Sequence, residues 1–232
     1  MAVGVLIALS LVVVLAGFRF YSRYREQVIR TEESQLLTMA GIVGNNLNSY
    51  MEQQLEEIDL FYSQEGMPEN VWAESGGINA RTAYFLKNNA GVYNWITVTE
   101  PDGTKFRYEL GKKTFRESAD GEVKAVDSQD GNHPAEITGK EISDQTGWYE
   151  LYIEKNVPVG SEVYMLTFAM DLGALYEKIV APVKIGEAGY SSVKDQNMNI
   201  IMQHVKNQIG LEAVDGRIER YPYIDMSSLN AW

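Results

Sequence analysis

The stretch Lys184-Ile-Gly-Glu-Ala-Gly-Tyr-Ser-Ser-Val-Lys-Asp-Gln-Asn-Met-Asn-Ile-Ile-Met-Gln-His-Val-Lys-Asn-Gln-Ile-Gly210 decides the fold of this chain. Alternating side chains over 190–195 predict a strand, the polar residues after it predict a turn, and the apolar run over 200–202 predicts a return strand. Gly186 and Gly189 come just before, where a chain that leaves a helix often needs backbone angles that suit glycine. The stretch therefore predicts a β-hairpin.

This hairpin resembles the closing hairpin of bacterial Cache domains, which are PAS-like extracytoplasmic sensor modules. The shared order is Gly-x-x-Gly-Tyr, a strand, Asp, a turn, Ile-Ile and Ile-Gly. Two departures are visible in the sequence. Met198 stands where the family usually turns on glycine, and Gln203-His204 stands where the family usually has His-Pro.

The residues before the hairpin extend the resemblance. The run 164–179, Tyr-Met-Leu-Thr-Phe-Ala-Met-Asp-Leu-Gly-Ala-Leu-Tyr-Glu-Lys-Ile, resembles the family's strand and short helix in register. The architecture is similar over 31–210, and specific residues match over 164–210. The resemblance implies an α+β fold in which a stalk helix lies behind a PAS-like antiparallel sheet.

Composition excludes several classes of protein. The chain has 232 residues, which suggests one or two domains, and its hydrophobic share of 45% is ordinary for a globular protein. A net charge of −12 argues against binding to nucleic acid and against docking on anionic lipid head groups. The absence of cysteine excludes thiol catalysis, thiolate metal sites and disulfides.

The N-terminal residues 1–24 predict a transmembrane helix and its interface. The run 2–18 is apolar apart from Ser10, and Phe20, Tyr21 and Tyr24 are aromatic residues typical of a membrane interface. A cleaved signal peptide is the alternative interpretation. Its hydrophobic core would be unusually long here, and the residues that follow are bulky and basic rather than small.

The charges around this helix complicate its orientation. Arg19, Arg23, Arg25 and Arg30 all follow it, so the positive-inside rule alone would place the rest of the chain in the cytoplasm. The start lacks a charged segment and looks truncated, and residues before it could carry the retained positive charge. The resemblance to sensor modules favours a single-pass protein of the bacterial cell membrane with an extracytoplasmic sensor domain.

Residues 25–65 predict the stalk helix. Its apolar residues recur at alternating intervals of four and three, which is the coiled-coil spacing, at Leu36, Ala40, Val43, Leu47 and Tyr50. The first half of the helix is expected to pair with a second copy and form a homodimer. The second half is expected to pack on its own domain.

Residues 66–210 predict the sensor domain, beginning with a loop over 66–77 and a short helix over 80–87. Alternating residues then predict a strand over 93–99, and the Pro-Asp-Gly turn at 101–103 predicts a partner strand over 105–110. Segments rich in Tyr, Val, Ile and Phe predict strands over 148–157 and 162–171, and apolar residues on one face predict a short helix over 172–180. The polar segment 112–147 is expected to be partly an extended loop. The last segment, 211–232, is expected to begin a further element that the chain truncates.

Catalysis within this chain is not expected. His133 and His204 are the two histidines, and both are assigned surface or structural roles because no partner motif accompanies them. The acidic run 127–132 lacks the ligand spacing of a calcium loop. We therefore expect no metal and no cofactor.

A sensor needs a pocket, and the resemblance implies one between the sheet and the loops that cover it. Arg107 would pair with the carboxylate of an amino acid or organic acid, and Asp171 or Asp195 with an amine. Core packing and cross-strand pairing are alternative roles for the aromatic residues, and turn closure is one for Asp195. The candidate ligand-binding residues are Trp95, Arg107, Tyr108, Trp148, Tyr149, Tyr164, Asp171 and Asp195.

The sequence therefore predicts the ligand-sensing region of a bacterial receptor of the histidine kinase, diguanylate cyclase or chemoreceptor type. Its partners would be a small-molecule ligand, the membrane and a second copy of the chain. A pilin-like structural protein is an alternative, but the run 2–18 has no glutamate of the kind that pilins carry there. A ligand-free dimerisation module is the other alternative.

Overall fold

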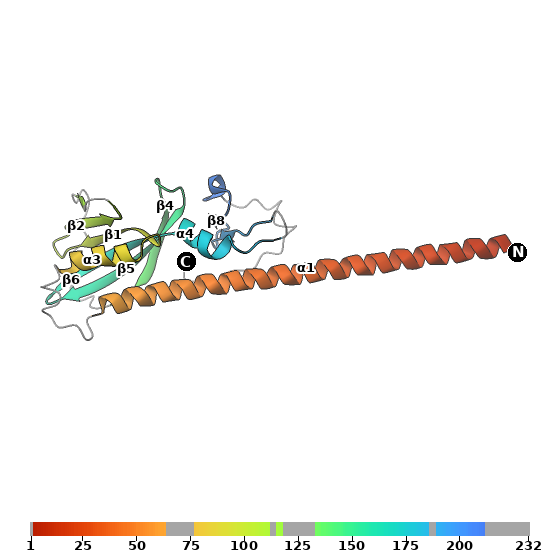
Figure 1. Cartoon of the computed structure of the whole chain (residues 1–232), viewed down its shortest axis with the longest axis horizontal. Helices are drawn as coiled ribbons and strands as arrows, with labels where there is room; N and C mark the ends of the chain where they lie inside the picture. The colour runs from red at the N-terminus through yellow and green to blue at the C-terminus, as the bar shows by residue number, and fades with distance from the viewer. Residues whose placement is uncertain (1, 64–76, 112–114, 118–132, 186–188, 212–232) are drawn as a thin grey trace.

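The computed structural model describes residues 2–63, 77–111, 115–117, 133–185 and 189–211, with side chains from residue 11 onward outside 115–117. The predicted loop over 66–76, the Asp-Gly turns at 120–121 and 130–131, and the segment 212–232 lie outside the described residues. Within the described part, one long helix lies along an antiparallel sheet, and a small hairpin stands beside that sheet (Figure 1). The α+β class and the long N-terminal helix are confirmed.

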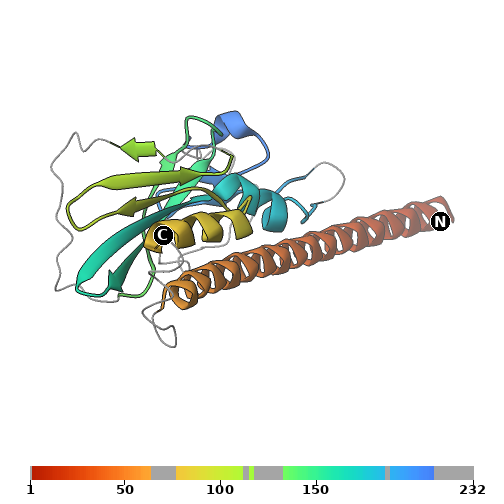
Figure 2. The ribbon, with the colours of Figure 1, turned by 60° about the vertical axis from the view of Figure 1, so that its left-hand side comes forward.

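The helix α1 (Ala2–Tyr62) is continuous, with no break between the two predicted segments 1–24 and 25–65. Its C-terminal half lies along the domain, and its N-terminal half extends well beyond it (Figure 2). The prediction that the second half packs on its own domain is confirmed by its buried side chains, Met51, Ile58 and Tyr62. Val43 and Leu47 of the predicted coiled-coil seam are buried as well, so the packing on the domain begins earlier than predicted. At 1.5 Å per residue, this helix is about 90 Å long.

Within the described part of the chain, no helix combines the length and the apolar character that crossing a membrane requires. The predicted transmembrane segment depends in large part on residues 1–10, whose side chains lie outside the described residues.

Six antiparallel strands form the main sheet in the order β3-β2-β1-β6-β5-β4. The strands are β1 (Tyr93–Thr99), β2 (Lys105–Glu109), β3 (Phe115–Glu117), β4 (Glu136–Ile142), β5 (Tyr149–Val159) and β6 (Glu162–Asp171). The first and last long strands of the sheet, β1 and β6, lie side by side at its centre, as PAS-like topology requires. The four strands predicted over 93–99, 105–110, 148–157 and 162–171 are confirmed.

The expectation of a loop over 112–147 is wrong for 136–142, which form the edge strand β4. An edge strand has one unpaired side and tolerates exposed polar residues, so its sequence carries little apolar signal. Ile137 and Ile142 are the apolar residues of β4, and a register shift lies between Ile137 and Gly139. The irregular register breaks the two-residue period by which a strand is recognised.

One face of the sheet is covered by helices and forms the core. Side chains at alternate positions of β1, β5 and β6 meet α1 and α3 (Gly77–Asn88), and six of them are fully buried: Ile96, Val98, Ile153, Val157, Leu166 and Phe168. Phe168 makes an edge contact with Phe85 of α3 and another with Tyr62 of α1, at centroid distances of 5.6 Å and 5.9 Å. This aromatic cluster fixes both helices against the same strand.

The chain then turns from β6 into α4 (Leu172–Leu175) and the π-helical turn η1 (Tyr176–Val180), which together confirm the predicted helix over 172–180. The hairpin follows as β7 (Val193–Lys194) and β8 (Ile200–Met202), before the short helix η2 (Lys206–Gln208). The predicted hairpin is confirmed, with a shorter first strand. Met198 takes a φ of 64° in its turn, which is the left-handed region that favours glycine.

Candidate ligand-binding face of the sheet

The face of the main sheet opposite α1 and α3, here called the outer face, carries polar and aromatic side chains. One cross-strand row runs through Glu109, Trp95, Ala169 and Tyr152, on β2, β1, β6 and β5 in turn. Because Ala169 has only a methyl group, the Trp95 and Tyr152 rings meet above it with centroids 5.6 Å apart. These two rings form an aromatic floor near the centre of the sheet.

Arg107 lies above this floor. The register pairs it with Thr97, one row from Trp95, and its guanidinium carbon is 4.1 Å from the centroid of the Trp95 ring. Its Nε atom is 2.9 Å from Oε1 of Glu109. A stacked guanidinium keeps its charge and its fork of donors. Arg107 is therefore a cation held flat on an aromatic surface, with 26% of its side chain exposed.

Glu150 lies at the edge of the same indole. Its carboxylate accepts hydrogen bonds from Trp95 Nε1 at 3.1 Å and from Asn94 Nδ2 at 2.7 Å. The residue is only 6% exposed. Among the described residues, no basic side chain lies within ion-pair distance of it. A buried carboxylate that has only neutral donors is costly, and a cation beside it would lower that cost.

Two further acidic residues lie beside Glu150, one on each neighbouring strand. The register pairs Glu150 with Glu141 on β4 and with Asp171 at the end of β6. Burial raises the pKa of Asp171, the neighbouring Glu150 charge raises it further, and the N–H of Gly173 opposes both. The outer face is therefore acidic at this end and cationic at Arg107.

Tyr152 lies between these two ends as a neutral hydrogen-bonding group. Its hydroxyl donates to Oε2 of Glu141 at 3.1 Å. Burial and the adjacent Glu141 carboxylate together raise the pKa of Tyr152 to about 12, and the Arg107 charge partly opposes this. The phenol therefore keeps its proton across the physiological range and remains a donor.

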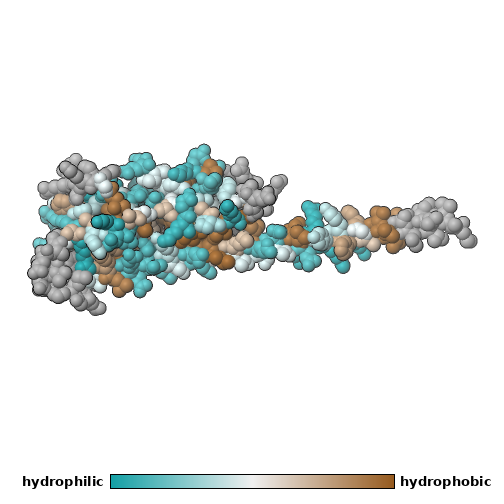
Figure 3. Space-filling view, viewed as in Figure 1, coloured by the Kyte–Doolittle hydropathy of each residue, from teal (hydrophilic) through white to brown (hydrophobic). Residues whose placement is uncertain are grey.

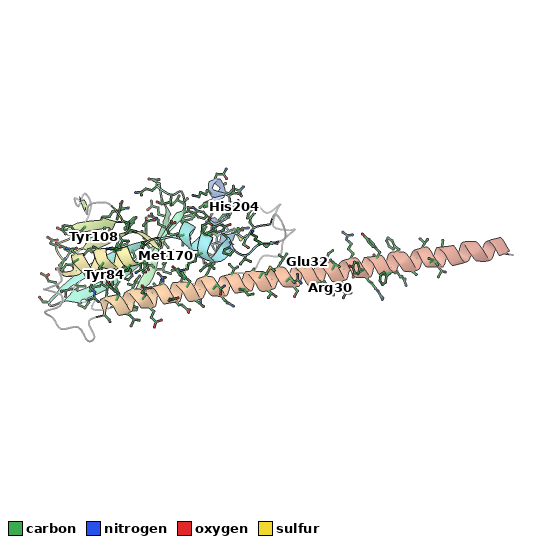
Figure 4. All side chains as sticks on the ribbon, in the orientation of Figure 1. Arg30, Glu32, Tyr84, Tyr108, Met170 and His204 are labelled. Atoms are coloured by element: carbon green, nitrogen blue, oxygen red, sulfur yellow. The ribbon has the colours of Figure 1, made fainter. Side chains whose placement is uncertain are left out.

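Three of the eight residues predicted from the sequence lie on or beside the outer face: Trp95, Arg107 and Asp171. Two others lie on the opposite face. Tyr108 donates to Oδ1 of Asn79 at 2.6 Å, from β2 to α3 (Figure 4), and Tyr164 donates to Oε2 of Glu162 at 3.0 Å. Asp171 also caps α4, because it accepts the N–H of Gly173 at 2.8 Å.

The remaining three predicted residues lie near the hairpin. Trp148 is buried and stacks on Tyr176 with centroids 5.3 Å apart. Tyr149 is half-buried and pairs with Ile142 at the end of β4. Asp195 closes the hairpin turn by accepting the N–H of Asn199 at 2.9 Å, and it makes an ion pair with Lys140 at 3.0 Å.

Sequence reasoning missed Glu150, Tyr152, Glu109, Asn94 and Glu141. The signal that could have found them is the two-residue period of the strands. Trp95 faces outward, so its register partners on neighbouring strands face outward as well. The sequence does not give the register between β5, β6 and β1, so it could not show that these residues lie beside Trp95.

Solved structures with a similar fold are sensory domains. A domain of a protein assigned to the sensory box/GGDEF family from Vibrio parahaemolyticus has a TM-score of 0.57 at 13% identity, covering 87% of this chain and 81% of its own. The ligand-binding domain of the Campylobacter jejuni chemoreceptor Tlp3, in complex with 4-methylisoleucine, has a TM-score of 0.56 at 11% identity, covering 82% and 77%.

The ligand-binding domain of Mlp24 with asparagine has a TM-score of 0.54 at 16% identity, covering 87% of this chain and 80% of its own. No family model matches the chain, and no curated protein matches its sequence. At these identities the similarity establishes the fold. The chain therefore has the fold of the sensor domains of bacterial receptors, which is the Cache, PAS-like architecture that its hairpin predicts.

Proposed function

We propose that this chain is the ligand-sensing region of a bacterial signal-transduction receptor, and that its outer face binds a small molecule carrying both an ammonium and a carboxylate group. The observation that carries this proposal is Glu150. It is a buried carboxylate that has two neutral donors and faces away from the helices. An ammonium group from a ligand would supply the missing positive charge.

The arrangement around Trp95 suits an amino acid. Arg107 lies over the face of the indole, and Glu150 lies at its Nε1 edge. A ligand beside the ring, between these two groups, would direct its carboxylate to Arg107 and its ammonium to Glu150. Charge-assisted hydrogen bonds of this kind are about twice as strong as neutral ones. The amino-acid ligands of the Tlp3 and Mlp24 domains support this class of ligand for a shared fold.

The first part of α1 supports a membrane anchor. Seven apolar side chains there are 56–75% exposed, and together they form an apolar surface at the end of the extended helix (Figure 3): Leu11, Val12, Val13, Val14, Leu15, Phe18 and Phe20. A surface of this kind requires a cover. We assign that cover to the lipid bilayer and place the sensor domain outside the cell. In this proposal a second copy of the chain pairs along the stalk helix, and the output domain lies in another part of the receptor.

Calorimetric titration of the whole chain in lipid nanodiscs tests the ligand class. The titrants are amino acids, organic acids and amines, and the variants are Glu150→Gln and Glu136→Gln. Glu136 is an exposed residue of the edge strand β4, which lies three strands from the strand of Trp95 in the sheet, so its variant makes the same change of charge at the edge of the outer face.

Binding of at least one amino acid is expected, with affinity lowered about 10- to 100-fold by E150Q and unchanged by E136Q. Equal binding by wild type and E150Q would refute the role of Glu150. Failure of every titrant to bind would favour a ligand-free dimerisation module instead.

A further inference from the structure

Four arginines lie within twelve residues of α1, directly after its apolar segment: Arg19, Arg23, Arg25 and Arg30. All four are exposed, on the part of the helix that extends beyond the sheet, where Arg30 is visible (Figure 4). Among the described residues, none of them makes an ion pair. Glu26 is the one acid among them, so this part of the helix carries a positive charge although the chain carries −12.

Aromatic side chains alternate with these arginines. Phe18, Phe20, Tyr21 and Tyr24 are 60–75% exposed. Aromatic rings and arginines concentrate at the boundary between the hydrocarbon core and the head groups, where an apolar body and a polar end are both solvated. The residues 18–30, here called the interface segment, have this composition over 18–25 and end at Arg30.

The spacing along the helix fits the thickness of that boundary. Arg19, Arg23 and Arg25 lie within about 10 Å of Phe18 along the axis, whereas Arg30 lies about 18 Å away. The head-group layer on one side of a bilayer is about 5–8 Å thick. Arginine side chains in a helix also lean toward its N-terminus, which brings the first three guanidinium groups to the depth of the lipid phosphates.

We propose that the interface segment binds the phosphate groups of anionic phospholipids. This inference rests on the membrane anchor proposed above and adds a lipid class to it. Charge complementarity selects this partner. In a parallel pair of stalk helices, the same arginines would oppose one another, so a second copy of the chain would be repelled at this position. The proposal departs from the expectation drawn from the net charge of −12, because most of the acidic residues lie elsewhere in the chain.

Lipid retention measured by native mass spectrometry tests the proposal. The whole chain in detergent is given equal amounts of a phosphatidylglycerol and a phosphatidylcholine with the same acyl chains. The ratio of the two bound species is then compared at low and high salt. The test variant is the triple substitution Arg19→Gln, Arg23→Gln and Arg25→Gln. The control is Lys87→Gln, Lys105→Gln and Lys184→Gln, which removes the same charge from the sensor domain.

Wild type and control should prefer the anionic lipid by at least about fivefold, because one basic residue near an anionic surface contributes about this factor. The triple arginine variant should bind both lipids equally, and salt should weaken the preference of wild type. Equal retention by wild type, or an unchanged preference in the arginine variant, would overturn the proposal while leaving the anchor intact. Retention of neither lipid would overturn the anchor as well.

Discussion

The Nζ atom of Lys155 lies 2.9 Å from Oδ1 of Asp59, so an ion pair joins β5 to α1 on the face of the sheet opposite the candidate ligand site. Lys155 is 3% exposed and also donates to the carbonyl of His133 at 2.6 Å. Asp59 accepts the N–H of Ala135 at 2.8 Å. Successive residues of β5 therefore face in turn the candidate ligand site on one side of the sheet and the stalk helix on the other.

A second contact repeats this relationship on β1. The hydroxyl of Tyr93 donates to Oε1 of Gln54 at 3.2 Å, and both residues are buried. Tyr93 precedes Trp95 by two residues, with a register shift between them. Both strands that carry the aromatic floor are thus bonded to α1. A ligand that moves these strands would displace the stalk helix through Asp59 and Gln54.

Removing either partner of the Lys155–Asp59 pair should destabilise the fold by different amounts. Asp59→Ala removes the carboxylate that lies 2.9 Å from the buried ammonium of Lys155 and should cost about 3 kcal/mol. Lys155→Met keeps most of the side-chain volume and leaves Asp59, whose side chain is 32% exposed, accessible to water, so it should cost about 1 kcal/mol. Urea unfolding gives both values. A larger loss for K155M would contradict the assignment of Lys155 as the buried partner.

Two glycine substitutions in helices should have opposite effects. A Cβ at Gly173 would lie 2.6 Å from the Trp148 ring, so Gly173→Ala should cost about 1–3 kcal/mol through overpacking. A Cβ at Gly41 would meet nothing within 4 Å, so Gly41→Ala in α1 should stabilise the protein by about 0.5–1 kcal/mol. Thermal unfolding measures both. Stabilisation by G173A would show that Trp148 is free to move.

Glycine should be the better residue in the turn of the hairpin. Met198 has a φ of 64°, so Met198→Gly should relieve strain and stabilise the protein by about 1 kcal/mol. Its neighbour Asn197 has no positive φ, so Asn197→Gly should bring no gain and serves as the control. Chemical denaturation compares the two variants. Destabilisation by M198G would mean that the side chain of Met198 contributes more than its backbone strain costs.

The stability of the hairpin should fall in acid. Burial alone would raise the pKa of Asp195, but hydrogen bonds from Lys140 and Asn199 lower it below its usual value. A carboxyl with a lower pKa in the folded state stabilises above the unfolded pKa of about 3.9, and this contribution is lost as pH falls through the folded pKa. Asp195→Asn should therefore flatten the loss of stability below about pH 4.

The contribution of Asp171 to stability should depend on pH in the opposite direction. Its pKa is raised by burial, so its protonated form is favoured in the folded state, and its contribution is lost as pH rises through the folded pKa. Urea unfolding between about pH 3 and pH 6 separates the two carboxyls, with Asp171→Asn as the counterpart variant. The assignment of Asp195 fails if D195N loses stability in acid as steeply as wild type.

Local sequence signals predicted most of the fold. The period of two identified β1, the Pro-Asp-Gly turn identified β2, and residue composition identified β5 and β6, while the hairpin residues indicated the fold. The edge strand β4 was missed because its residues are polar and its register is irregular. It pairs with β5 across the short turn over 143–148, so its polar composition, and not its distance along the chain, concealed it.

The candidate site was less accessible from the sequence than the fold. Residue type alone selected Trp95 and Arg107 as candidates, but it gave equal weight to Trp148 and Tyr108. The structure places Trp148 in the core and Tyr108 against α3. Glu150 was missed because a glutamate on a strand looks exposed. Its burial and its contact with Trp95 follow from the β5–β6–β1 register, which a single sequence does not provide.

The most direct test of the central claim compares an amino acid with its des-amino analogue. L-asparagine and succinamic acid differ in the ammonium group, and each is titrated calorimetrically into wild type and into the Glu150→Gln variant; a panel of other amino acids follows if asparagine does not bind. The account predicts that wild type binds the amino acid at least about tenfold more tightly than the analogue, and that E150Q removes this difference. Equal affinities in wild type, or a preference that survives in E150Q, would contradict it.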